Sequence, residues 1–192
     1  SIVPVKDING AYAGNPINDS NNPMGQLSRN KDNKQKRVQA LGNVFANLYV
    51  GDFTFKTSFG LDYQNYNIRS FSPTYDEILS TNNTNSLSTS NSFNYQFSFT
   101  NTLNYKKQFG KHHLDAILGQ ESIEYNYEGF SASVSEFLYE DLNFRYLSFG
   151  TENMLNSGSA NGWSLNSYFG RVNYNFDEKY LFTATVRRDG SS

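Results

Sequence analysis

The chain has 192 residues, which suffices for one large domain or two small ones and for a sizeable core. Only 37% of the residues are hydrophobic while 16% are aromatic, a balance that argues against disorder and against an α-helical protein and favours β structure. The net charge of −2 excludes nucleic-acid binding by bulk electrostatics, and the lack of cysteine excludes disulfide scaffolds and thiolate metal sites.

The N-terminal part is rich in Asn, Gly, Pro, Asp and Lys and follows neither the strand nor the helix period, so we expect residues 1–36 to be a loop or linker. The opening SIVPVKDING lacks the charged start and apolar run of a signal peptide. No run approaches the ~18 apolar residues of a transmembrane helix. The sequence thus predicts either a soluble cytoplasmic chain or a targeting segment outside these residues.

From residue 37 onward the pattern is that of strands. Residues 37–50 have weak contrast between their two faces, and Gly51-Asp52 then predicts a short turn. The segment FTFKTSFGLDYQN alternates with period two, which predicts a strand with an aromatic face. Lys56 and Asp62 fall on its polar face. Residues 93–106 alternate even more clearly, with an almost unbroken aromatic face.

Short and long connections alternate along the chain. Tight turns are predicted at residues 51, 110 and 177, whereas residues 70–90 and 129–163 are expected to form long, Ser- and Asn-rich loops. An outer-membrane barrel has short turns at one end, long loops at the other, and apolar residues facing lipid. About six antiparallel strands between residues 37 and 192 fit this up-and-down scheme.

The closing stretch, SYFGRVNYNFDEKYLFTATVRRDGSS, resembles the barrel of SusC/RagA-type TonB-dependent outer-membrane transporters, in which a short D-E-K-Y turn and an R-R-D-G-S-S strand end recur. Upstream, LGNVFANLYVGDFTFKTSFGLDY and HHLDAILGQES stand in the order that this family gives. The resemblance covers residues 37–192. It implies that the chain is an internal piece of a 22-stranded β-barrel whose plug, TonB-contacting segment and other strands lie elsewhere.

The same resemblance implies a function and partners. The whole protein would import large nutrients, oligosaccharides or peptides, across the outer membrane of a Gram-negative cell. It would work with a SusD-like surface lipoprotein and the TonB complex, and it would contact outer-membrane lipid but no nucleic acid. No cofactor is implied.

Few residues suggest chemistry. His112 and His113 are neighbours that would point to opposite faces of a strand, so we expect a turn and no metal site. Glu121 and Glu124 would likewise face apart, which argues against paired glycosidase carboxylates, and no catalytic residue is predicted.

Two sets of residues are better candidates. Sugars stack on exposed aromatic rings, so four aromatic residues in or beside the second long loop are predicted to bind ligand: Tyr139, Phe144, Tyr146 and Trp163. The second set falls on the polar side of the alternating strands and is therefore predicted to face the barrel lumen: Lys56, Asp62, Arg171 and Arg187.

Three other classes of protein remain open at this stage. A soluble or surface-attached β-sandwich that binds glycans could also use aromatic faces, although it would need more Leu, Ile and Val to fill its core. An adhesin-like structural sheet is a third possibility. An outer-membrane enzyme is the fourth, and it would need a catalytic group that the sequence does not show. Aromatic side chains that face lipid would indicate the transporter, whereas aromatic side chains packed in a core would indicate the sandwich.

Overall fold

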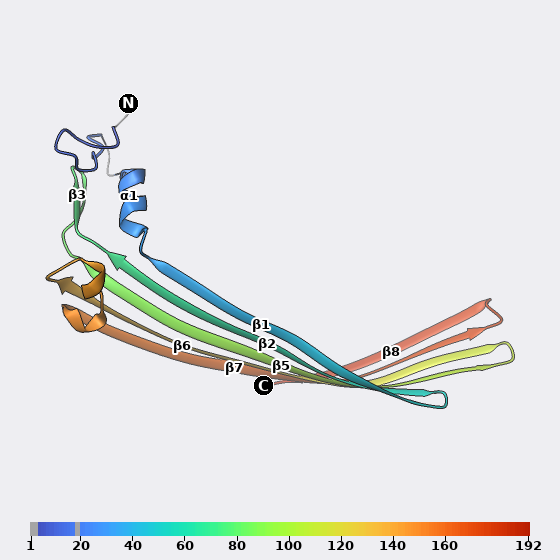
Figure 1. The fold of residues 1–192 in the computed structure, drawn as a ribbon. Helices are drawn as coiled ribbons and strands as arrows, with labels where there is room; N and C mark the ends of the chain where they lie inside the picture. The colour runs from blue at the N-terminus through green and yellow to red at the C-terminus, as the bar shows by residue number, and fades with distance from the viewer. Residues whose placement is uncertain (1–3, 18–19) are drawn as a thin grey trace. The chain divides into compact units, whose positions relative to one another are not determined.

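The computed structural model describes residues 4–17 and 20–192 and is built almost entirely of antiparallel strands, as the sequence predicts (Figure 1). One six-stranded sheet has the order β1-β2-β5-β6-β7-β8, and β3 pairs with β4 in a small hairpin. The main-sheet strands are β1 Lys34–Val50, β2 Phe53–Ser72, β5 Ser86–Phe109, β6 His112–Phe137, β7 Gly150–Phe176 and β8 Tyr180–Ser191. The smaller elements are α1 Pro23–Asn30, β3 Tyr75–Glu77, β4 Ser80–Asn82, and the 3-10 turns η1 Leu142–Phe144 and η2 Leu147–Phe149.

The chain divides into two compact units. The loop unit comprises residues 1–37, 66–92 and 129–159, and the hairpin unit comprises residues 38–65, 93–128 and 160–192. The hairpin unit contains all three tight turns, which join β1 to β2, β5 to β6 and β7 to β8. The loop unit contains α1, the β3–β4 hairpin and both 3-10 turns.

The three tight turns lie where the sequence predicts them. Gly51 and Gly110 both have φ of +58°, a backbone conformation that glycine adopts without steric cost. Asp177 has φ of +53°, which aspartate tolerates better than most residues. Each turn therefore reverses the chain within a few residues and sets the register of its hairpin.

The register of β7 and β8 separates two chemically different faces of the hairpin unit. Gly170 lies opposite Val186, and Tyr174 lies opposite Phe182, so these apolar residues share one face. Arg171 lies opposite Thr185, and Asn173 lies opposite Thr183, on the other face. The alternation expected from the sequence is thus confirmed pair by pair.

Apolar burial is confined to the loop unit. Phe71, Leu87, Val134 and Phe137 form its core, and the rings of Phe71 and Phe137 meet edge to face at 5.3 Å between centroids. The hairpin unit, all of whose residues the structure describes, buries no apolar side chain. Its apolar face is therefore open to the surroundings.

Both long loops are shorter than expected. β2 continues to Ser72 and β5 begins at Ser86, with the β3–β4 hairpin between them, where the sequence suggests a loop over residues 70–90. Likewise β6 continues to Phe137 and β7 begins at Gly150, so residues 138–149 replace the expected loop of 129–163. Neighbouring strands supply backbone partners to these Ser- and Asn-rich segments, which lets them extend without an apolar pattern.

The N-terminal stretch also contains an element that the sequence pattern does not reveal. Residues 23–30 of the expected linker 1–36 form helix α1. The Asn22 side chain accepts from the backbone N–H of Met24 at 3.1 Å and caps the helix, while Pro23 occupies its first turn. Eight residues are too few for a helical period to stand out, so capping and tertiary contacts determine this helix.

Candidate ligand-binding surface

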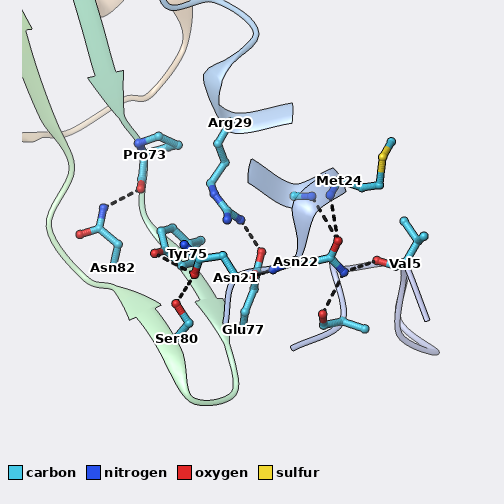
Figure 2. Close-up of polar contacts among 12 residues, drawn as sticks. Val5, Asn21, Asn22, Met24, Arg29, Pro73, Tyr75, Glu77, Ser80 and Asn82 are labelled. Carbon is cyan, nitrogen blue, oxygen red and sulfur yellow. Dashed lines mark hydrogen bonds and ion pairs between the residues drawn. The ribbon is translucent and has the colours of Figure 1, made fainter. Parts of the chain in front are cut away.

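A buried carboxylate joins the N-terminal segment to the β3–β4 hairpin (Figure 2). Glu77 ends β3 with its side chain 1% exposed. Its Oε2 accepts from the backbone N–H of Asn22 at 2.6 Å, and its Oε1 accepts from Arg29 Nη1 at 2.5 Å. The Arg29 guanidinium also lies 3.9 Å from the ring centroid of Tyr75. Helix α1 is thereby held against the hairpin by a charged pair largely removed from water.

Asn22 extends this network in the other direction. Its Nδ2 donates to the carbonyl oxygens of Ala13 at 2.9 Å and Val5 at 3.0 Å. Gly14 lies so close to β3 that a Cβ there would stand 2.2 Å from the Glu77 carbonyl oxygen, so only glycine fits. The described N-terminal residues are therefore ordered by polar contacts and close backbone approach.

A second polar contact holds the connection between β6 and β7. Asn85 is buried and pairs with both backbone groups of Phe137, accepting from its N–H at 2.7 Å and donating to its C=O at 3.0 Å. Asn85 Nδ2 also donates to Glu140 Oε1 at 3.0 Å. The same Glu140 oxygen accepts from the backbone N–H of Thr74 at 2.7 Å. This network fixes the start of the segment that carries the predicted aromatic residues.

Three of the four predicted ligand-binding aromatics come together in the loop unit. The ring centroids of Tyr139 and Phe144 are 5.2 Å apart, and Phe149 joins Phe144 at 5.6 Å and Tyr146 at 6.3 Å. We call these four residues the aromatic cluster. All four are exposed, so their rings can contact a ligand as well as one another. Sequence reasoning missed Phe149 because nothing in the local pattern separates it from a packing residue.

Two arginines flank the cluster. Arg69, near the end of β2, lies 4.9 Å from the Tyr146 ring centroid and donates to the Arg145 carbonyl oxygen. Arg145 follows η1, and its guanidinium lies 4.3 Å from the Phe71 ring centroid. Its Nη1 stands 3.6 Å from Asp32 Oδ2. Sequence reasoning missed both arginines, since residues 69 and 145 meet only in the folded chain.

Trp163, the fourth predicted aromatic, lies in the hairpin unit and does not join the cluster. It belongs to β7 and stacks on Tyr125 of β6, with the centroids 5.7 Å apart and the planes at 18°. Gly162 permits this approach, because a Cβ there would stand 2.9 Å from the Tyr125 carbonyl oxygen. Trp163 remains partly exposed and forms a separate aromatic surface.

The four residues predicted to face the lumen all lie in the hairpin unit. Arg187 is the most connected, since it pairs with Glu121 at 3.2 Å, Asp189 at 2.8 Å and Ser167 at 3.0 Å. Arg171 donates to Asn173 at 3.1 Å.

The other two of these residues lie on β2. Lys56 stands 5.1 Å from the Phe45 ring centroid, and Asp62 accepts from Gln39 at 3.2 Å. All four side chains are held by polar or ring contacts on their own unit.

The histidines and glutamates do not form a reactive group. His112 Nδ1 lies 2.6 Å from the Tyr174 hydroxyl, and its ring stacks on Phe109. Glu121 pairs with Arg187, whereas Glu124 accepts from Asn126, so the two carboxylates have different partners. Within residues 4–17 and 20–192, no group of three or more His, Asp or Glu side chains is placed to hold a metal ion.

None of the described helices has the length and apolar character needed to span a membrane.

The chain is similar in sequence to proteins named as TonB-dependent receptors. No protein-family model matches the chain. TonB-dependent receptor P3 of Formosa agariphila is 32% identical over 194 residues, which cover 98% of this chain and 19% of that receptor. TonB-dependent receptor SusC of Bacteroides thetaiotaomicron is 31% identical over 105 residues, which cover 52% of this chain and 10% of SusC.

The fold is similar to that of a solved transporter. A chain of the RagAB peptide transporter superposes with a TM-score of 0.82 and 25% identity, over 96% of this chain and 21% of that one. This chain therefore spans about one fifth of the length of P3 and of the RagAB chain. These relatives are named as receptors and transporters, not as enzymes.

Proposed function

We propose that this chain, which is related to one segment of the TonB-dependent receptors that include SusC, forms part of the β-barrel of an outer-membrane importer of large nutrients. In the whole protein, further strands close the sheet into a barrel of about 22 strands. The importer takes up oligosaccharides or peptides, is driven by the TonB complex, and works with a SusD-like surface lipoprotein.

The observation that carries this proposal is the exposed apolar face of the hairpin unit. On β8, the Val186 side chain is 71% exposed and Phe182 is 62% exposed, and both share a face with Val172 and Tyr174 of β7. Apolar patches of this kind mark membrane or protein contacts, since burying them in water-free surroundings is favourable. The opposite face of the same strands is polar, as the lumen side of a barrel is.

The height of the apolar face supports a lipid environment. On β6 the apolar residues extend from the turn near Lys111 to Gln120, which donates to Asn166 of β7 at 3.3 Å. About nine residues at 3.3 Å each give about 30 Å along the strand. At a tilt of about 40° this is about 23 Å, close to the ~25 Å apolar band of outer-membrane barrels.

The same register supports the proposed site residues. Arg171 and Arg187 lie on the polar face of β7 and β8, opposite the apolar one. We assign them, together with Lys56 and Asp62 of β2, to the lumen wall. The aromatic cluster and Trp163 are assigned to ligand contact, because partly exposed rings offer flat apolar surfaces to sugar rings or peptide side chains.

A β-sandwich is disfavoured by the same surfaces. Two packed sheets would bury one complete face of each strand. The buried apolar residues of the described chain are Ala13, Phe71, Leu87, Val134 and Phe137, all in the loop unit. The aromatic face of the hairpin unit is left without a second sheet, which favours lipid as its partner.

The test uses the full-length receptor expressed in a Gram-negative cell. Val186→Asp places a charge on the apolar face, where it should prevent assembly of the heat-modifiable barrel seen on gels without boiling. Thr185→Asp is the matched control, because its position is adjacent, also exposed and on the polar face. Equal assembly of both variants, or recovery of the receptor outside the outer-membrane fraction, would contradict the proposal.

A further inference from the structure

The loop unit contains a small cavity with an excess of positive charge. It has a volume of about 240 Å³ and lies between the start of β1, the end of β2 and the connection that contains η1. The charged residues that line it are Lys34, Arg69, Arg145 and Asp32. Three cations against one carboxylate leave a formal charge of +2.

We propose that this cavity binds a carboxylate group of the imported substrate. The inference rests on the proposed function, because it assigns a substrate chemistry to the surface beside the aromatic cluster. The ligand is defined by its anionic group, which a uronic acid unit of an oligosaccharide or an acidic group of a peptide can supply.

One of the three cations is already engaged and forms the wall of the cavity. Arg145 Nε donates to the Glu140 carbonyl oxygen at 2.8 Å, and its side chain is only 14% exposed. The nearby Asp32 side chain, 25% exposed, offsets its charge. Arg145 therefore positions the connection and takes little part in neutralising an incoming anion.

The other two cations have no such compensation. Among the described residues, no carboxylate oxygen lies within 4.0 Å of the charged nitrogens of Lys34 or Arg69. The Arg69 guanidinium lies 4.9 Å from the Tyr146 ring centroid and donates from Nη2 to the Arg145 carbonyl oxygen, so two contacts hold its orientation. The remaining N–H groups lie in the same plane, and a planar fork matches the two oxygens of a carboxylate. A fixed arginine loses little entropy on binding, which favours affinity.

The size and lining of the cavity limit what it holds. Cavities that enclose a whole small molecule measure about 300–1,000 Å³, so about 240 Å³ accommodates one charged unit of a longer chain. Tyr146 lines the same cavity and belongs to the aromatic cluster. The cavity thus serves as a charged subsite next to a stacking surface, an arrangement that suits an oligomer carrying regular carboxylates.

The experiment measures binding to the purified full-length receptor in detergent by calorimetry. The probes are trigalacturonate and its methyl ester, and a pentapeptide with a free C-terminal carboxylate and the same peptide with a C-terminal amide. We expect at least one acidic probe to bind about tenfold more tightly than its neutral counterpart. This is the gain in affinity that one charge-assisted contact in a half-exposed site supplies. The pair that shows the difference identifies the source of the carboxylate.

Variants connect this preference to the cavity. Arg69→Met should abolish it, Arg69→Lys should restore part of it through charge alone, and Lys34→Gln should reduce it. Lys36→Gln is the matched control, because Lys36 is an exposed lysine two residues along β1 that does not line the cavity. Barrel assembly is checked for each variant on gels without boiling.

Three results would overturn the inference: neutral probes that bind as tightly as acidic ones, an acid preference that survives Arg69→Met, or no binding of either acidic probe to the wild-type receptor at millimolar concentration. If Arg69→Met does not assemble, the exposed Lys34→Gln variant decides the question. Assembly and outer-membrane location are measured separately, so a failed charge preference leaves the importer proposal intact.

Discussion

Replacing Arg29 by Met should release the N-terminal segment from the β3–β4 hairpin. The substitution keeps an aliphatic side chain but removes the partner of Glu77, whose side chain is 1% exposed. Removing one partner of a buried ion pair costs about 3–5 kcal/mol, and we take about 3 because the Asn22 N–H still bonds Glu77. The lost contact with the Tyr75 ring adds about 1 kcal/mol. A total near 4 kcal/mol means that the N-terminal segment opens away from the β3–β4 hairpin about a thousandfold more often than in the wild type.

Hydrogen exchange of the full-length receptor, followed by mass spectrometry, measures this opening directly. Protection should fall in peptides covering residues 20–31 and 74–82 and stay unchanged in β7 and β8. Lys31→Met is the control, since Lys31 is exposed at the end of α1. The double variant Arg29→Met with Glu77→Leu should recover much of the protection, because no buried charge is left unpaired. Protection of Arg29→Met within threefold of the wild type would refute this account of the anchor.

Two further substitutions test the other unit and the aromatic cluster. Gly119→Ala places a Cβ 2.1 Å from the Phe169 ring and should destabilise the hairpin unit by about 1–3 kcal/mol. The folded gel band should then be lost at a lower temperature. Gly42→Ala is the control and should be neutral, because a Cβ there meets nothing within 4 Å. Tyr139→Ala should weaken binding of a neutral oligosaccharide or peptide ligand several-fold by calorimetry, while Tyr180→Ala at the β7–β8 turn of the hairpin unit should not. Equal affinities for both variants would remove Tyr139 from the ligand surface.

Features with local causes were predictable from the sequence. The faces of β7 and β8 follow from strict alternation, so Val172 and Thr185 could be assigned to opposite sides before their pairing was known. Gly51 and Gly110 identify the turns because few other residues adopt their backbone conformation. The relation to SusC-type receptors, expected from the closing stretch, is confirmed by the relatives.

Features with distant causes were not predictable. Arg69 and Arg145 are separated by 76 residues and become neighbours only when β2 and the η1 connection meet. Asn85 looks like any other asparagine of a Ser- and Asn-rich stretch, yet it satisfies both backbone groups of Phe137. The Ser- and Asn-rich composition of residues 129–163 predicts a loop that ends at Trp163, whereas pairing with a neighbouring strand makes Trp163 part of β7. Contacts of this kind leave no mark on local sequence pattern.

The two units rely on different interactions, and this difference bears on ligand recognition. The hairpin unit buries no apolar side chain of its own, so stabilisation by removal of apolar surface from water must come from contact with its surroundings. In the proposed barrel, lipid provides that contact. The loop unit is held by a small core and by buried polar groups such as Glu77 and Asn85, which are costly to leave half satisfied. Such networks define one geometry, so they place Arg69 and the aromatic cluster reproducibly while leaving their outer surfaces exposed. A rigid support beneath exposed side chains lets the surface residues change ligand preference without loss of the fold, because the buried network does not depend on them.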